Sequence, residues 1–110
     1  MYIYIITYRF KTINGKQRPI YNAFIDWVEA NGKCDDTTST AYYRSIHNYE
    51  TIKDEIESLY TKDCPIHEDD HISIIEVDEE SDEVTKIFSL VDKDWKEADT
   101  ILEMITDEDF

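Results

Sequence analysis

Hydrophobic positions in the first third of the chain change from a strand pattern to a helical pattern. Residues 2–10 carry β-branched and aromatic side chains on both faces, which is typical of a central strand. The pair Asn14-Gly15 indicates a turn, and Pro19 suits the first position of a helix that Gly32 would end. Five apolar residues at helical spacing predict that helix: Ile20, Ala23, Phe24, Trp27 and Val28.

A second strand and a second helix are predicted next. Residues 39–46 have a strand pattern in which Tyr42 and Tyr43 alternate, so at least one of them should face the core, and residues 33–38 are a short partner strand or a connection. Asn48 is a candidate N-cap, and the helix must end near Pro65, because the residue before a proline disfavours helical geometry. The apolar face of this helix is Tyr49, Ile52, Ile56, Leu59 and Tyr60.

Two strand patterns and a final helical pattern follow. Residues 71–77 and 84–91 predict strands, separated by an acidic turn at residues 78–83. Asp94 and Glu97 have the spacing of a capping box, so we expect a C-terminal helix over residues 94–106. Its apolar stripe would be Trp95, Ala98, Ile101, Leu102 and Ile105, and its other face is nearly all acidic.

This order of elements predicts an α+β fold, most simply a ferredoxin-like sandwich. Its small, mainly antiparallel sheet would have helices on one face, with the acidic C-terminal helix added. The length of 110 residues suits one domain, with a core over residues 1–80 and an acidic strand-helix extension over residues 81–110. Residues 84–91 would leave an apolar strand edge unless it is paired, so we expect a homodimer.

Charge is distributed unevenly along the chain. Residues 66–110 hold 17 Asp and Glu against three Lys, a net charge of −14, whereas residues 1–65 have a net charge of −1, and together these make −15. Such a surface repels nucleic acid and anionic membranes, so a partner should present a basic surface. The opening residues are apolar without a basic leader, and two isolated cysteines favour reduced thiols over a disulfide. We therefore expect a cytoplasmic protein.

Three segments, covering about 70 residues, carry a resemblance to a known family: the opening YIITYRF, the strand STAYYRSI with the following helix YETIKDEIESLY, and EDDHISIIEVD. With them the chain resembles small ferredoxin-like proteins of the SinR-type and CRISPR-adaptation nuclease-like group. The resemblance implies a ferredoxin-like fold and a dimer. In the nuclease branch an Asp follows the tyrosine of the first strand and is thought to hold a divalent metal across the dimer. Here Arg9 follows Tyr8, and a guanidinium cannot ligate Mg²⁺.

Other candidate sites have simpler explanations. His67 and His71 match the zinc motif H-E-x-x-H, but Pro65 and the turn between them argue against the shared helical face that the motif needs. We expect no metal or cofactor there, although the turn at residues 67–70 leaves an adventitious cation open. Ser39 and Thr40 lack the setting of a nucleophile, so we expect no catalytic residue. Four cations form a phosphate-binding edge or a solvated loop balanced by acids: Arg9, Lys11, Lys16 and Arg18.

The acidic half is either a solubilising face or a binding face. We expect the second: a non-enzymatic protein, an inhibitor or nucleic-acid mimic of viral or anti-defence type, that occupies a basic surface of a nucleic-acid-binding protein. A metal-dependent nuclease with displaced ligands and a plain interaction subunit remain alternatives. The expected binding residues are Glu76, Asp78, Glu79, Glu80, Asp82, Glu83, Asp99, Glu103 and Asp107.

Overall fold

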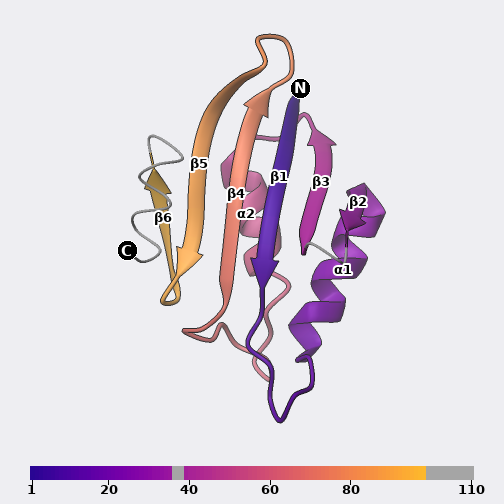
Figure 1. The fold of residues 1–110 in the computed structure, drawn as a ribbon, viewed down its shortest axis with the longest axis vertical. Helices are drawn as coiled ribbons and strands as arrows, with labels where there is room; N and C mark the ends of the chain where they lie inside the picture. The colour runs from indigo at the N-terminus through magenta and orange to yellow at the C-terminus, as the bar shows by residue number, and fades with distance from the viewer. Residues whose placement is uncertain (36–38, 99–110) are drawn as a thin grey trace.

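The computed structural model of the chain describes residues 1–35 and 39–98. They form a small α+β fold of six strands and two helices (Figure 1). In chain order the elements are β1 (Tyr2–Arg9), α1 (Pro19–Asn31), β2 (Gly32–Asp35), β3 (Thr40–Ser45), α2 (Tyr49–Glu57), β4 (His71–Asp78), β5 (Glu83–Val91) and β6 (Asp94–Ala98).

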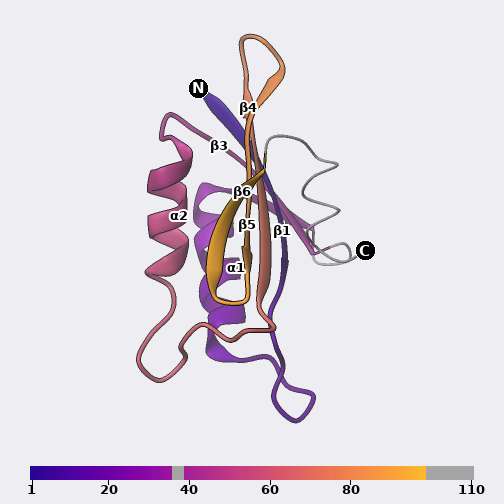
Figure 2. The ribbon, with the colours of Figure 1, turned by 90° about the vertical axis from the view of Figure 1, so that its left-hand side faces the viewer.

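All six strands belong to one sheet, in the order β2-β3-β1-β4-β5-β6, and every neighbouring pair is antiparallel. Strand β1 lies at the centre between β3 and β4, as its two apolar faces predicted. Both helices lie on the same side of the sheet (Figure 2). This arrangement is compatible with the ferredoxin-like α+β class.

Local sequence signals place the ends of these elements. Asn14 and Gly15 both have positive φ, 53° and 76°, and form the tight turn that the dipeptide predicted. Pro19 begins α1, and the side chain of Asn48 caps α2 by accepting a hydrogen bond from the backbone N–H of Thr51 at 3.3 Å. Gly32 ends α1 in an extended conformation and begins β2 directly. The segment after α1, for which the sequence allowed a strand or a connection, therefore contains a strand.

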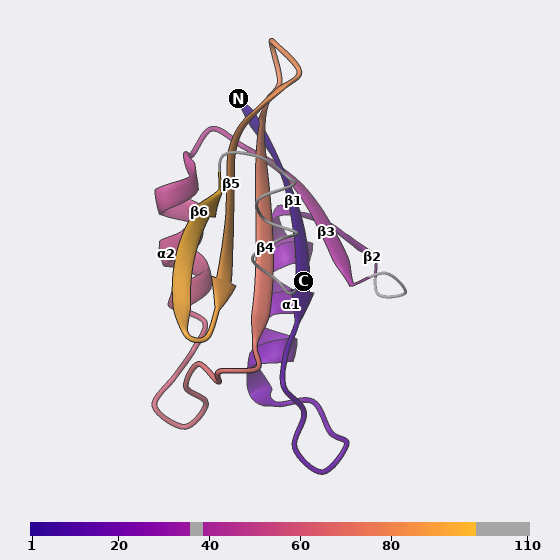
Figure 3. The same ribbon diagram turned by 60° about the vertical axis from the view of Figure 1, so that its left-hand side comes forward.

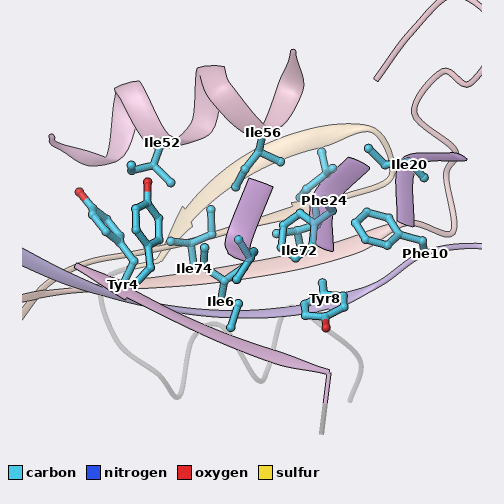
Figure 4. Packing of buried hydrophobic residues seen from close by; sticks show 14 of the residues in the cluster. Tyr4, Ile6, Tyr8, Phe10, Ile20, Phe24, Ile52, Ile56, Ile72 and Ile74 are labelled. Atoms are coloured by element: carbon cyan, nitrogen blue, oxygen red, sulfur yellow. The ribbon is translucent and has the colours of Figure 1, made fainter. Parts of the chain in front are cut away.

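The core fills the space between the helices and the sheet (Figure 4). Phe24 of α1 contacts Tyr8 of β1 with ring centroids 4.6 Å apart, and Tyr49 of α2 contacts Phe88 of β5 at 5.0 Å. Tyr43 is 6% exposed and packs in this core, whereas Tyr42, its neighbour on the strand, is 48% exposed. Each large apolar side chain buried this way contributes about 1.5–3 kcal/mol. The fully buried aliphatic residues include Ile6, Ile20, Ile52, Ile56, Ile72 and Ile74.

The predicted C-terminal helix does not begin at Asp94. Residues Asp94–Ala98 form β6, which pairs with β5, and residues 99–106 lie outside the described part of the chain. Asp92 and Lys93 have positive φ, 53° and 66°, so they form a two-residue hairpin turn that returns the chain along β5. Trp95 then packs against Phe88 of β5 with ring centroids 5.7 Å apart. The capping-box spacing was misleading because this tertiary pairing outweighs it.

Strand β5 is not a sheet edge. It lies between β4 and β6, so the bare apolar edge expected at residues 84–91 is paired within the chain. The edge strand at this end is β6, whose exposed residues Asp94, Lys96 and Glu97 are charged, as is usual for protected edges. The reason given for expecting a dimer through residues 84–91 is therefore removed.

Candidate functional site

The acidic turn between β4 and β5 extends beyond the rest of the sheet (Figures 1 and 3). We call residues 78–83 the acidic hairpin. Backbone and side-chain hydrogen bonds order it: the Asp82 N–H donates to the Asp78 carbonyl at 2.8 Å, and the Glu80 N–H donates to Asp78 Oδ1 at 2.9 Å. The left-handed conformation of Asp82, with φ of 58°, closes the turn. Its carboxylates therefore project from a folded element.

Only part of the hairpin's charge is neutralised within the described residues. Arg44 of β3 binds both carboxylate oxygens of Glu79, at 2.9 Å through Nε and 2.6 Å through Nη2. Glu80, Asp82 and Glu83 are exposed and form no ion pair in residues 1–35 and 39–98. This end of the molecule is left strongly negative.

Glu76 does not share the surface of the acidic hairpin. It is 4% exposed and points into the helix-covered side of the sheet, where its Oε2 accepts a hydrogen bond from the Tyr4 hydroxyl at 2.6 Å. Its Oε1 accepts a hydrogen bond from the Thr85 hydroxyl at 2.7 Å. Burial, together with the hydrogen bond and charge of Glu76, raises the pKa of Tyr4 well above that of a free tyrosine. Glu76 therefore stabilises the interior.

The remaining acids predicted for the site are not placed. Asp99, Glu103 and Asp107 lie outside the described residues. Of the nine predicted binding residues, five therefore lie together on the acidic hairpin: Asp78, Glu79, Glu80, Asp82 and Glu83.

The four cationic side chains in and next to the loop after β1 differ in burial and in ion pairing. Arg18 is buried and forms an ion pair with Asp70, at 2.6 Å between Nη1 and Oδ1. Lys11 forms an exposed ion pair with Asp69 at 3.7 Å. Arg9 and Lys16 form no ion pair within the described residues. The loop thus combines a structural ion pair with a small exposed basic surface.

A shallow pocket opens beside this loop. Its lining residues are Arg9, Phe10, Lys11, Thr12 and Gln17, together with Asp69 from the loop before β4. We call these six residues the basic pocket. Its position was not evident from the sequence, because Asp69 comes from a loop that the fold brings next to residues 9–17.

The H-E-x-x-H match has no zinc-site geometry. His67 lies in a loop and His71 begins β4, so the two rings do not share a helical face. Asp70, between them, is fully buried and directs both oxygens to other groups. No group of three or more His, Cys, Asp or Glu side chains suited to a metal ion occurs in the part of the chain that the structure describes.

Sequence reasoning missed the polar cluster around Asp70. The Tyr60 hydroxyl donates to Asp70 Oδ2 at 3.1 Å, and burial together with that carboxylate raises the pKa of Tyr60. The sequence shows only that Arg18 stands before the start of α1 and that Asp69 and Asp70 stand before the start of β4. It does not show which of the two aspartates is buried. The pairing depends on contacts across 52 residues.

No helix in the described residues is both long and apolar enough to cross a membrane. Cys64 is a buried free thiol. No family model matches the chain, and no match was found among curated proteins or solved structures.

Proposed function

We propose that this chain is a non-enzymatic acidic binding protein with a ferredoxin-like core. It would occupy a basic surface of a nucleic-acid-binding protein, as an inhibitor or nucleic-acid mimic. The observation that carries the proposal is the acidic hairpin, an ordered element with five carboxylates in six residues that projects from the sheet. The ferredoxin-like assignment is supported by the order β2-β3-β1-β4, which matches the split βαβ arrangement when α1 and α2 are the connections.

Charge density supports mimicry of a phosphate backbone. Six residues folded back on themselves span about 10 Å at a rise of about 3.4 Å per residue. Arg44 pairs with Glu79, so the other four carboxylates give roughly one charge per 2.5 Å. Duplex DNA carries one charge per about 1.7 Å of its axis. A basic groove built for DNA would thus meet a similar density of negative charge on the hairpin.

The order of the hairpin favours binding over a purely solubilising role. Its hydrogen bonds fix the backbone that carries Glu80, Asp82 and Glu83, so the hairpin loses less conformational freedom on binding than a flexible acidic tail would lose. Complementary charge would also speed the encounter with a basic partner and make it sensitive to salt.

The nuclease alternative receives no support from the described residues. Arg9 ends β1, where the resembling nucleases place an acid. Asp70 is the nearby buried carboxylate, and its oxygens already accept hydrogen bonds from Arg18, Tyr60 and backbone N–H groups. A cation at Asp70 would have to displace that network.

The test is capture of partners from the native host by the tagged protein and by two variants. The hairpin variant carries Glu80→Lys and Glu83→Lys, which change exposed side chains that form no ion pair within the described residues. The control variant carries Asp26→Lys and Glu29→Lys, the same change in charge at exposed positions on α1. We expect the parent and the control to capture a basic nucleic-acid-binding protein that DNA or RNA displaces, and the hairpin variant to lose it.

Salt and competition separate this proposal from a plain interaction subunit. Binding through the hairpin should weaken steeply between about 50 and 200 mM salt, as phosphate contacts do. A partner that holds the protein and its nucleic acid at the same time, with affinity indifferent to salt and to the hairpin variant, would contradict mimicry.

A further inference from the structure

The two ends of the sheet differ in charge: the acidic hairpin lies at one end, and the exposed cations Arg9, Lys11 and Lys16 lie at the other, where Glu68 and Asp69 are also exposed. In the β1–β4 pair Tyr2 lies opposite Asp78, whereas Arg9 lies opposite His71, so the acidic hairpin and Arg9 are at opposite ends of these strands. In Figure 1 the hairpin is at the top and the loop after β1 is at the bottom. The molecule measures 44 Å along its longest axis. At physiological salt the Debye length is about 8 Å, so the two ends act as separate charged surfaces.

The basic end is built on a rigid frame. The backbone groups of Ile13 and Lys16 exchange two hydrogen bonds of 2.9 Å around the Asn14-Gly15 turn. The Lys11 N–H donates to Asp70 Oδ1 at 2.8 Å, which ties the loop to the buried ion pair. Lys16 is therefore displayed on an ordered loop beside the pocket that Arg9 lines.

This end has cationic groups that are available to an anion. The guanidinium of Arg9 has no hydrogen bond or ion pair within the described residues, although it lines the pocket. The partner of Lys11 is Asp69, but that pair is long, at 3.7 Å, and both side chains are about half exposed. Exposed pairs of this kind are weak and exchange readily with another carboxylate.

From this complementarity we propose that the acidic hairpin of one copy docks into the basic pocket of a second copy. The hairpin supplies the unpaired carboxylates of Glu80 and Glu83, and the pocket end supplies Arg9 and Lys16. Both surfaces are ordered before they meet, which lowers the entropic cost of docking. The ion pairs that form in contact lie within a Debye length, whereas repulsion between the more distant acids is screened.

The geometry gives an open chain of copies. The acidic hairpin and the basic pocket are different surfaces at opposite ends of the molecule, so the contact between two copies is heterologous. Heterologous contacts that add copies in nearly the same direction build an open chain and do not close into a ring. We therefore expect a concentration-dependent series of oligomers with no discrete dimer. This inference does not rest on the proposed function, because it needs only this chain.

Sedimentation velocity between about 50 µM and 1 mM tests the inference, a range suited to weak contacts made by exposed ion pairs. The parent protein should sediment faster as concentration rises, and less so at high salt. The hairpin variant and a pocket variant with Arg9→Glu and Lys16→Glu should each remain at the monomer mass of 13.1 kDa. An equimolar mixture of these two variants should associate again, because each restores the opposite charge to the other's surface.

The α1 control variant Asp26→Lys/Glu29→Lys separates this contact from general repulsion. It reduces the net negative charge as much as the hairpin variant does, so it should associate at least as well as the parent. Circular dichroism and thermal melting check that all variants are folded. A parent that stays monomeric over the whole range, equal behaviour of hairpin and control variants, or a mixture that fails to associate would each overturn the inference.

Discussion

Arg18 and Asp70 join two loops through a buried ion pair of 2.6 Å, with exposed fractions of 7% and 0%. Asp70 also accepts hydrogen bonds from the N–H groups of Lys11 and His67 and from the Tyr60 hydroxyl. Arg18 donates in addition to the carbonyl of Pro65 at 2.6 Å. Burial alone would lower the pKa of Arg18, but the hydrogen bond and charge of Asp70 outweigh it and raise that pKa.

The first prediction concerns this ion pair. Replacing Arg18 by Met should destabilise the protein by about 3–5 kcal/mol, because it leaves the charge of Asp70 buried without its partner. Urea unfolding followed by circular dichroism measures the change. The matched control is Lys11→Met, which breaks an exposed pair and should change stability by less than about 1 kcal/mol.

Restoring neutrality should recover only part of that loss. In an Arg18→Met/Asp70→Asn double variant no buried charge remains, but three groups still donate toward residue 70: the N–H groups of Lys11 and His67 and the Tyr60 hydroxyl. The amide has one oxygen where the carboxylate has two, so it cannot accept all three hydrogen bonds in the same way. A single Arg18→Met variant as stable as the parent would contradict the structural role assigned to the pair.

The second prediction concerns the Tyr4 hydroxyl. It lies 2.5 Å from the His47 carbonyl and 2.6 Å from Glu76 Oε2, so one phenolic hydrogen serves two acceptors. Tyr4→Phe should cost about 1–3 kcal/mol, because it leaves buried polar atoms with fewer partners. Tyr42→Phe removes the same hydroxyl from a side chain that is 48% exposed and should be nearly neutral in the same unfolding assay. Equal effects of the two changes would contradict this prediction.

The third prediction is a loss of stability in alkali. Burial raises the pKa of Tyr4, Tyr43 and Tyr60 in the folded protein, and neighbouring carboxylates add to the rise. Below pH about 10 both states keep these protons, so the stability is complete there. Above it the unfolded chain loses protons first, so stability falls by up to about 1.4 kcal/mol per pH unit for each tyrosine.

Tyrosinate absorbance, recorded together with circular dichroism, measures that response. We expect part of the eight tyrosines to titrate near pH 10 in the folded protein and the rest to titrate only as the fold is lost. The urea-unfolded protein is the control, since all of its tyrosines should titrate together. Complete titration of the folded protein near pH 10 with an unchanged spectrum would be the contrary result.

The fourth prediction tests the β5–β6 turn. Lys93 has φ of 66°, a conformation that glycine adopts without strain, so Lys93→Gly should stabilise the protein by about 0.5–1 kcal/mol. Lys96→Gly, the same change within β6, should instead destabilise it by a similar amount. Thermal unfolding compares the two variants. Destabilisation by both changes alike would argue against the hairpin.

The sequence by itself determined the elements whose signals are local. The turn at Asn14-Gly15, the start of α1 at Pro19 and the cap at Asn48 depend on backbone preferences of one or two residues, and each is found where the pattern predicted it. The acidic turn at residues 78–83 followed in the same way from the strand patterns on either side.

Tertiary structure decided the features that depend on contacts between residues far apart in the sequence. The pairing of Asp94–Ala98 with β5 overrode a capping-box spacing, because Trp95 gains more by packing on Phe88 than the segment gains from helix propensity. The same acidic composition gave Glu76, Asp70 and Glu80 three different roles, since burial and distant partners set the role of a carboxylate. Those partners are brought near only when the sheet is assembled, so no local pattern carries them.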